Sequence, residues 1–232
     1  MSRPFTFINV AATADGKIDT IERRGAAISS ARDKQRVDLL RAGADAVMVG
    51  GRTLLHEDPS LTVKSAALRA GRAERGLPEN PIKVGVVTRA DLHPTSRFLA
   101  SGASRAVIFT TSQTSEDQLE ALHSLGAKVF ILGHSRVDLE AALDALYSLG
   151  VRWLMVEGGA TLNFELLKRG LVDELTLYVA PMIFGGAAAP TLASGAGVFR
   201  SDAIPLALEE VEAWDDGGVL LHYKIRDAAR RD

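Results

Sequence analysis

The sequence predicts an α/β protein with a mostly parallel sheet that has helices on both faces. From residue 5 to residue 170, short apolar runs alternate with segments of helical periodicity, as in strands joined by helical crossovers. Beyond residue 173 the pattern changes to two strand-like segments joined by Asp215-Asp216-Gly217-Gly218, which predicts an antiparallel C-terminal hairpin.

The composition narrows the class of protein. The chain has 232 residues, 47% of them hydrophobic, so we expect a single domain over residues 1–232 with a substantial core. A net charge of −2 gives no electrostatic reason to expect nucleic acid or a membrane surface as a partner. There is no signal peptide, no apolar run near the roughly 20 residues of a spanning helix, and no cysteine for disulfides or zinc–thiolate sites. We therefore expect a cytoplasmic enzyme.

The apolar runs give the strands, and capping residues give several helix starts. The expected strands are residues 5–11, 46–49, 83–87, 106–109, 129–132, 153–156, 175–180, 207–214 and 219–225. Ser30 with Asp33, and Ser115 with Gln118, have the spacing of capping boxes, so helices should begin there. Further helices are expected after Gly51, around residues 139–146 and over 160–169. Residues 64–80 lack the apolar periodicity of a core element and are expected to form a surface excursion.

The stretch from Trp153 to Asn163 is the most informative part of the chain. A short apolar run ends at Glu157, two glycines follow, and a helical pattern then begins. Such a turn lets an anion approach the free N–H groups of a helix start closely. The alternative is that the glycines only supply a backbone connection. The carboxylate favours a site, because core packing does not require a glutamate at a strand end.

Several common motifs are absent. The chain has no Gly-x-Gly-x-x-Gly after its first strand, no Gly-x-x-x-x-Gly-Lys-Ser/Thr and no Gly-x-Ser-x-Gly. Its five histidines show no metal-binding spacing. The polar residues that remain at strand ends suit a phosphorylated cofactor and a polar substrate better than nucleophilic catalysis.

Five pieces of the chain carry a family resemblance. They are Thr-Ala-Asp-Gly-Lys at 13–17, Thr-Leu-Leu-His-Glu-Asp-Pro-Ser-Leu-Thr-Val-Lys at 53–64, Val-Glu-Gly-Gly-Ala-Thr-Leu-Asn at 156–163, Leu-Val-Asp-Glu at 171–174 and Ala-Pro-Met-Ile-Phe-Gly-Gly at 180–186. In this order they resemble the reductase of riboflavin biosynthesis, a dihydrofolate-reductase-like domain. The resemblance implies hydride transfer from NADPH to C1′ of a ribosylaminopyrimidine 5′-phosphate, which gives the ribitylamino product, and it implies a homodimer.

The resemblance also implies which residues bind the two ligands. For the cofactor these are Ala11, Thr53, Glu57, Thr88, Gly158, Gly159, Ala160, Thr161, Leu162 and Asn163. For the substrate they are Asn9, Arg41, Leu61, Lys64 and Glu157. Arg89 either meets the 2′-phosphate of the cofactor or is a solvated loop arginine. The chain departs from the family pattern at Glu57, where Asp is common, and at Thr88-Arg89, where Asp-Ser is common.

The catalytic roles are predicted less directly. Asp15 and Lys17 follow the first strand, and Asp15 either relays a proton or only caps the Gly16 turn. Glu157 is expected to orient the substrate. We expect no deaminase domain, since that enzyme needs cysteines that the chain lacks. Two alternatives stay open, which are a pterin or dihydrofolate reductase on the same scaffold and a nucleotide-binding module without catalysis.

Overall fold

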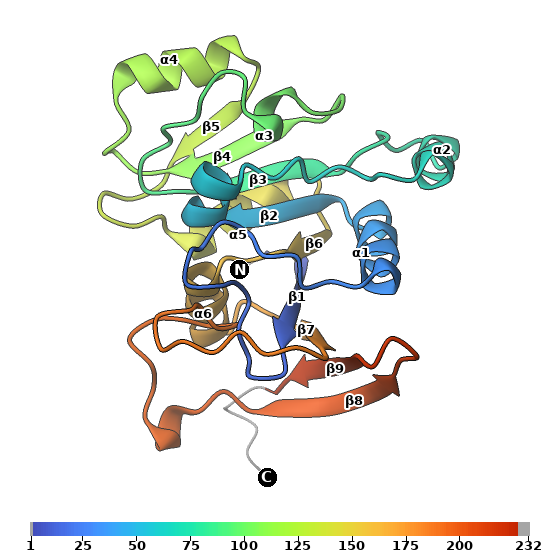
Figure 1. The fold of residues 1–232 in the computed structure, drawn as a ribbon. Helices are drawn as coiled ribbons and strands as arrows, with labels where there is room; N and C mark the ends of the chain where they lie inside the picture. Colours follow the sequence, from blue (N-terminus) through green and yellow to red (C-terminus); the bar gives the residue numbers. More distant parts are fainter. Residues whose placement is uncertain (1, 227–232) are drawn as a thin grey trace. The chain divides into compact units, whose positions relative to one another are not determined.

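The structure, a computed structural model, describes residues 2–226 (Figure 1). The chain forms two compact units. The first contains the chain up to Pro4 together with Gln35–Met155. The second contains Phe5–Lys34 and the chain from Val156 onward.

The first unit is built on parallel strands in the order β5-β4-β3-β2-β6. The strands β2 and β3, β3 and β4, and β4 and β5 each pair in parallel. Their carboxyl ends therefore meet at one edge, and the loops that follow Gly50, Val86 and Thr110 start there. The bounds are β2 Ala46–Gly50, β3 Ile82–Val86, β4 Ala106–Thr110, β5 Lys128–Ile131 and β6 Trp153–Val156.

One helix leads into β2, and the others lie between these strands. They are α1 Ala31–Gly43, the π-helix η1 Thr53–Glu57, α2 Ala66–Glu74, α3 Arg97–Ala100, α4 Glu116–Ser124 and α5 Leu139–Ser148. The predicted cap at Ser115 is confirmed, with both bonds of the capping box to Gln118 present. At the start of α1, Ser30 Oγ accepts a hydrogen bond from the Asp33 N–H at 3.2 Å.

Residues 64–80 form the surface excursion that the sequence predicts, but the sequence did not predict the helix that this excursion contains. The segment forms α2, at the end of a long excursion between β2 and β3 (Figure 1). Arg72 of α2 is only 2% exposed, and its guanidinium donates to the carbonyls of Ala42, Ala44 and Pro78 at 2.8–2.9 Å. An arginine that fixes carbonyl groups gives no apolar periodicity, so the sequence pattern did not reveal this element.

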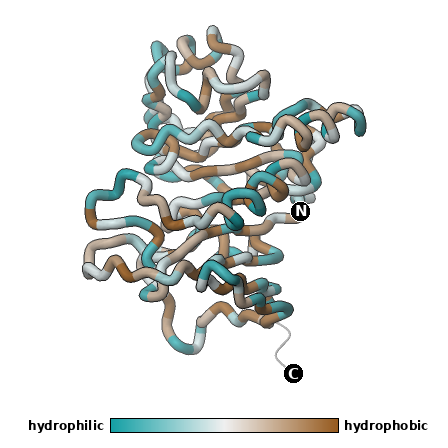
Figure 2. The backbone as a smooth tube through the Cα atoms, turned by 45° about the vertical axis from the view of Figure 1, so that its right-hand side comes forward, coloured by the Kyte–Doolittle hydropathy of each residue, from teal (hydrophilic) through white to brown (hydrophobic). Residues whose placement is uncertain are grey.

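The strands and α5 contribute much of the buried core of the first unit. Every residue of β2, β3 and β4 is buried, as expected for strands covered on both faces. Figure 2 shows hydrophobic residues along these strands. On α5, Leu139, Leu143 and Leu146 are buried at the spacing that the sequence predicted.

The second unit contains strands in the order β1-β7-β9-β8. β1 pairs in parallel with β7, whereas β9 is antiparallel to both β7 and β8. Tyr178 and Trp214 pack with ring centroids 5.1 Å apart in the core of this unit. The predicted α/β class with its antiparallel C-terminal hairpin is therefore confirmed. The bounds are β1 Phe5–Thr13, α6 Ala160–Lys168, β7 Glu174–Ala180, the 3-10 helix η2 Arg200–Asp202, β8 Leu206–Ala213 and β9 Val219–Ile225.

Candidate functional site

The loop after β2 begins the candidate site in the first unit. Gly51 allows close packing, because a Cβ at this position would lie 3.0 Å from Cγ2 of Val87. η1 follows at once, and within it Thr53 Oγ1 donates to Glu57 Oε1 at 3.1 Å. Two residues predicted to contact the cofactor are thus brought together on one helical turn.

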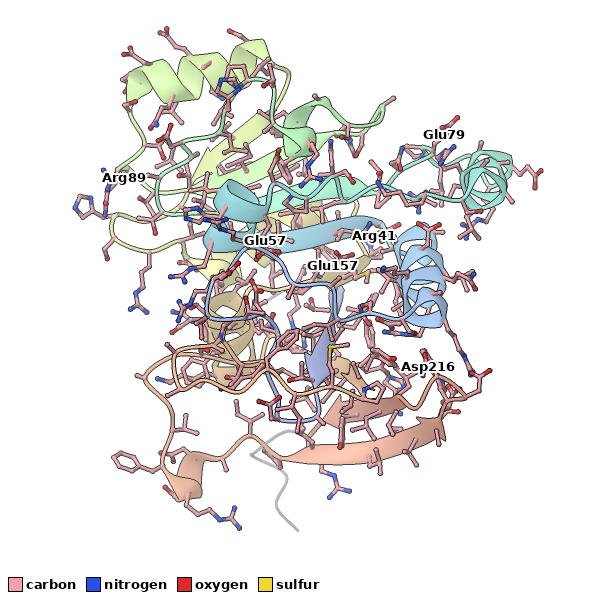
Figure 3. The ribbon with its side chains drawn as sticks, in the orientation of Figure 1. Arg41, Glu57, Glu79, Arg89, Glu157 and Asp216 are labelled. Carbon is pink, nitrogen blue, oxygen red and sulfur yellow. The ribbon has the colours of Figure 1, made fainter. Side chains whose placement is uncertain are left out.

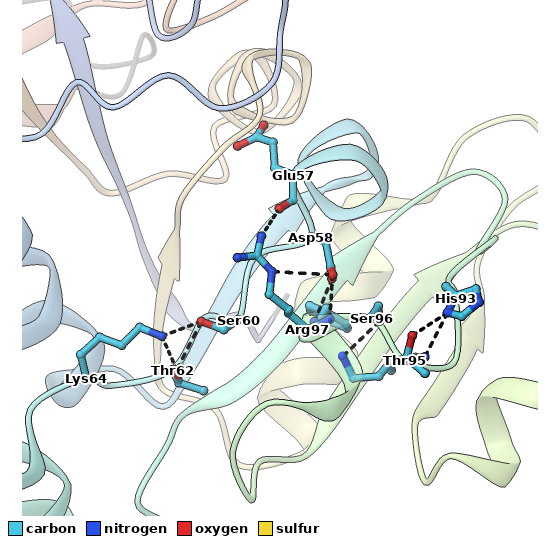
Figure 4. A network of polar contacts seen from close by, with 11 residues as sticks. Glu57, Asp58, Ser60, Thr62, Lys64, His93, Thr95, Ser96 and Arg97 are labelled. Atoms are coloured by element: carbon cyan, nitrogen blue, oxygen red, sulfur yellow. Dashed lines mark hydrogen bonds and ion pairs between the residues drawn. The ribbon is translucent and has the colours of Figure 1, made fainter.

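Asp58 fixes the end of η1 to the start of α3 (Figure 4). It has a left-handed backbone with φ 46°, and its carboxylate accepts from the N–H groups of Arg97 at 2.7 Å and Phe98 at 2.9 Å. The Arg97 guanidinium in turn donates to the Glu57 carbonyl at 2.6 Å. These bonds hold the backbone of the predicted cofactor contact from two sides.

The segment from Ser60 to Lys64 presents a fixed ammonium group. Lys64 Nζ donates to Ser60 Oγ at 2.8 Å and to Thr62 Oγ1 at 3.0 Å (Figure 4). The Asp38 carboxylate accepts from the Lys64 N–H at 2.6 Å, so the backbone is held as well. Burial, followed by the positive charge of Arg41, lowers the pKa of Lys64. Two neighbouring cations that repel each other suit the binding of a dianion such as a phosphate, because the dianion offsets the repulsion.

The other two substrate candidates of this unit differ in accessibility. Arg41, labelled in Figure 3, donates from Nη1 to the Thr62 carbonyl at 3.1 Å, so Arg41 and Lys64 both bond to Thr62. Leu61, by contrast, is 1% exposed and has φ 48°. Its side chain packs in the core, and its left-handed backbone turns the segment from Ser60 to Lys64.

The loop after β3 carries the last two candidates of this unit. Thr88 and Arg89 are both exposed, whereas the flanking Val87 and Ala90 are buried. Figure 3 marks the position of Arg89. The two side chains therefore stand at the tip of a loop with buried ends.

In the second unit, α6 begins directly after the two glycines of the informative stretch. Gly159 is its N-cap residue, and no side chain caps the helix start. Gly158 has φ 104°, which favours glycine, and a Cβ there would meet no atom within 4 Å. Glu157 is half-buried at the end of β6. The predicted strand, Gly-Gly turn and helix are confirmed.

The candidates on α6 are not equally accessible. Thr161 is exposed, but Ala160 and Leu162 are buried. Asn163 is fully buried, and its Nδ2 donates to the Leu192 carbonyl at 2.9 Å. Asn163 therefore ties α6 to the loop of residues 184–196.

Asp15 lies in the predicted turn after β1. Its carboxylate accepts from Thr13 Oγ1 at 2.5 Å, from the Gly185 N–H at 2.8 Å and from the Phe184 N–H at 3.3 Å. These hydrogen bonds lower the pKa of Asp15, and the bond from Thr13 has the largest effect. Lys17 Nζ donates to the Ala189 carbonyl at 3.4 Å. Both side chains thus reach the loop of residues 184–196.

The remaining candidates of the second unit lie on β1. Asn9 is 6% exposed and Ala11 is half-buried. In the part of the chain that the structure describes, no cluster of His, Asp and Glu residues could hold a metal ion. Between residues 2 and 226, no helix is long and apolar enough to cross a membrane.

The sequence matches one family over most of its length. A family model of the RibD C-terminal domain matches residues 4–221. This chain belongs to that family. The resemblance inferred from the five motifs is confirmed.

Named relatives of the RibD C-terminal domain family are similar to this chain. A protein of Archaeoglobus fulgidus named 2,5-diamino-6-ribosylamino-4(3H)-pyrimidinone 5′-phosphate reductase is 40% identical over 215 residues, which are 93% of this chain and 95% of that protein. A protein of the same name from Methanothermobacter thermautotrophicus is 39% identical over 208 residues, covering 89% and 92% of the two chains. The structure of a pyrimidine reductase-like protein from Corynebacterium diphtheriae has a TM-score of 0.82 at 22% identity, covers 97% of this chain and 93% of that chain, and supports the fold.

The start of α6 in this RibD C-terminal domain fits the phosphates of a dinucleotide. The helix start has no side-chain cap, Gly158 leaves open space, and Thr161 is exposed. Ala160, Leu162 and Asn163 are buried, and the Asn163 N–H donates to the Gly159 carbonyl at 3.0 Å, so Thr161 is the exposed side chain of this set. The residues present therefore suit a phosphate-bearing cofactor.

Two residues that position the candidates were missed from the sequence. Asp38 holds the backbone of Lys64, and Arg97 holds that of Glu57. Each lies 26 or more residues from its partner, so no local pattern could reveal the pairing. The structure shows Asp38 on α1 to be 8% exposed, and a carboxylate this buried requires a partner.

Proposed function

We propose that this chain is a reductase that converts a ribosylaminopyrimidine 5′-phosphate to the ribitylamino product with NADPH. The observation that most supports this proposal is the 40% identity, over 93% of this chain, to the Archaeoglobus fulgidus reductase. That similarity covers nearly the whole of both chains. The relatives' names support the phosphorylated pyrimidine as the substrate class.

The resemblance to the family assigns a set of residues to the cofactor. When bound, NADPH supplies a hydride for C1′ of the open-chain sugar. The hydroxyl of Thr53, the carboxylate of Glu57 and the Thr88–Arg89 tip are assigned to it, together with Ala11. From the start of α6, the free N–H groups after Gly158 and Gly159 are assigned to its pyrophosphate.

The proposed substrate contacts hold the phosphate and the sugar. Arg41 and Lys64 are assigned to the 5′-phosphate, because their cationic groups meet on the segment that ends at Lys64. Glu157 and Asn9 are assigned to the sugar and the ring, and Leu61 to a backbone contact. These groups orient C1′ and keep the sugar chain open.

Reduction also requires a proton for the nitrogen attached to C1′. Asp15 and Lys17 are the candidates of the second unit. The three donors on Asp15 support an anchoring role, because they stabilise its ionised form. We therefore assign proton delivery to Lys17, Glu157 or a bound water, with Asp15 fixing the adjoining loop.

A direct assay separates this proposal from its alternatives. Purified protein is mixed with NADPH and, in turn, the aminated pyrimidine phosphate, its deaminated counterpart and dihydrofolate, and nicotinamide absorbance is followed. Turnover with either pyrimidine phosphate supports the proposal and identifies the substrate. Turnover with dihydrofolate alone would assign a pterin reductase. NADPH binding without turnover of any of the three would assign a non-catalytic module.

We further propose a cytoplasmic homodimer. β8 is the edge strand of the second unit and exposes Leu206, Leu208 and Val211. A β-bulge between Leu208 and Glu210 shifts the alternation by one residue, so the three side chains share one face. An exposed apolar face on an edge strand suits pairing with a second copy.

A further inference from the structure

Three threonines surround the loop that carries Thr88 and Arg89. β3 and β4 pair in parallel, and this pairing continues past β3, where the Val87 N–H donates to the Phe109 carbonyl at 3.0 Å. The end of β4 and the turn after it therefore lie beside the loop. Thr110, Thr111 and Thr114 come from that turn, and they are 0%, 0% and 6% exposed.

The carbonyl of Thr88 accepts hydrogen bonds from two of these residues. Thr111 Oγ1 donates to it at 2.7 Å, the Thr111 N–H at 3.4 Å and Thr110 Oγ1 at 3.2 Å. A carbonyl oxygen needs only one or two hydrogen bonds to be satisfied, so three donors on the Thr88 carbonyl hold it more firmly than is usual.

The same residues also hold the other side of the loop. Thr114 Oγ1 accepts from the Ala90 N–H at 3.0 Å and lies 2.6 Å from Thr110 Oγ1. Thr110 already gives its proton to the Thr88 carbonyl, so Thr114 must be the donor in the bond between the two hydroxyls. A directed chain thus runs from the Ala90 N–H through Thr114 and Thr110 to the Thr88 carbonyl.

This directed chain of hydrogen bonds fixes the backbone on both sides of Arg89 and leaves the tip exposed. The two bonded backbone groups belong to the residues immediately before and after Arg89, while Thr88 and Arg89 themselves are solvent-exposed. A hydroxyl and a guanidinium on a rigid tip suit a phosphate, because little entropy is lost when the contact forms.

We propose that Thr110, Thr111 and Thr114 are positioning residues that set the preference for NADPH over NADH. They do so by holding the Thr88–Arg89 tip where it meets the 2′-phosphate. The inference rests on the proposed function, which assigns this tip to the cofactor. It adds that the selectivity depends on buried hydroxyls that never touch the cofactor.

Binding measurements test the inference without relying on turnover. The dissociation constants of NADPH, NADH and adenosine 2′,5′-bisphosphate are measured by calorimetry for the wild type and for Thr111→Val, Thr114→Val and Thr111→Ser. Thr6→Val is the matched control, because it removes another fully buried hydroxyl outside this cluster. Circular dichroism checks that each variant is folded, and Thr114→Val, which breaks the chain from Ala90 to Thr88, serves as the test if Thr111→Val does not fold.

We expect Thr111→Val and Thr114→Val to weaken NADPH and adenosine 2′,5′-bisphosphate by about three- to tenfold, the effect of one lost hydrogen bond. NADH binding should stay within about twofold in both. Thr111→Ser, which keeps the hydroxyl, and Thr6→Val should retain the wild-type ratio.

Equal weakening of NADPH and NADH, or an unchanged ratio, would overturn the inference. If the wild type reduces the pyrimidine phosphate and prefers NADPH, either result refutes the positioning role alone. If the wild type binds both nicotinamide cofactors equally, the cofactor assignment in the proposed function fails and the inference fails with it.

Discussion

At the scale of single residues, Lys64 shows how a surface cation is prepared for an anion. Its ammonium is held by two hydroxyls, and its backbone is held by Asp38. Replacing Lys64 with alanine should raise KM for the phosphorylated pyrimidine about tenfold and leave kcat little changed. The loss should shrink as salt rises, because added ions screen the phosphate contact. Lys128→Ala, which removes an exposed lysine from β5, is the control, and unchanged kinetics in Lys64→Ala would move the phosphate site elsewhere.

The lowered pKa of Lys64 predicts a pH dependence. Its ammonium deprotonates below the ordinary lysine value of 10.5, because burial and Arg41 disfavour the charge. KM for the phosphorylated substrate should therefore begin to rise at a lower pH than for an ordinary lysine contact. KM is measured from about pH 7 to pH 10 for the wild type and Lys64→Arg. An arginine stays protonated over this range, so an identical rise in Lys64→Arg would contradict the assignment.

Asp15→Asn separates anchoring from proton relay. If Asp15 anchors the loop of residues 184–196, the variant should have a lower melting temperature and a kcat within about tenfold of the wild type. The stability difference should be complete above the ordinary carboxyl pKa of 3.8 and should vanish as pH falls through the lower folded value. A fall in kcat of about 10²-fold or more, with NADPH affinity intact, would instead identify Asp15 as the relay.

At the scale of elements, Asp58 joins η1 to α3 through two backbone N–H groups, while Arg97 adds one bond to the Glu57 carbonyl. Asp58→Ala should therefore cost more stability than Arg97→Ala. We expect about 1–3 kcal/mol for the first and below about 1 kcal/mol for the second. Urea denaturation of both single variants and the double variant gives these values and their coupling. The reverse order would show that the arginine, not the cap, holds the two elements together.

The elements also show what local sequence patterns can and cannot predict. The strands, the Ser115 cap and the turn at Gly158 followed from apolar runs and residue types that act over a few positions. The helix α2 did not follow from such local patterns, because Arg72 secures it by hydrogen bonds to backbone carbonyls, two of them distant in sequence. For the same reason, motifs could point to Thr53, Glu57 and Lys64 as site residues but could not predict what holds them.

At the scale of the whole molecule, the exposed face of β8 predicts self-association. Light scattering at micromolar concentration should give twice the chain mass of 24.7 kDa. Leu208→Glu puts a charge on a side chain that is 54% exposed in the single chain, so it should shift the equilibrium toward monomer. Ala207→Glu, on the neighbouring residue of the same strand, is the control for charge. A wild type that scatters as a single chain would contradict the dimer.

Isotope labelling shows whether the hydride passes from NADPH to C1′ of the sugar, as the proposed function requires. The protein is incubated with the pyrimidine phosphate and NADPH that carries deuterium at C4, using each of the two labelled stereoisomers in turn. We expect one stereoisomer to deliver one deuterium to C1′ of the ribitylamino product, which mass spectrometry and NMR would locate. A ribitylamino product without deuterium from either stereoisomer, or a label at any other carbon, would contradict it.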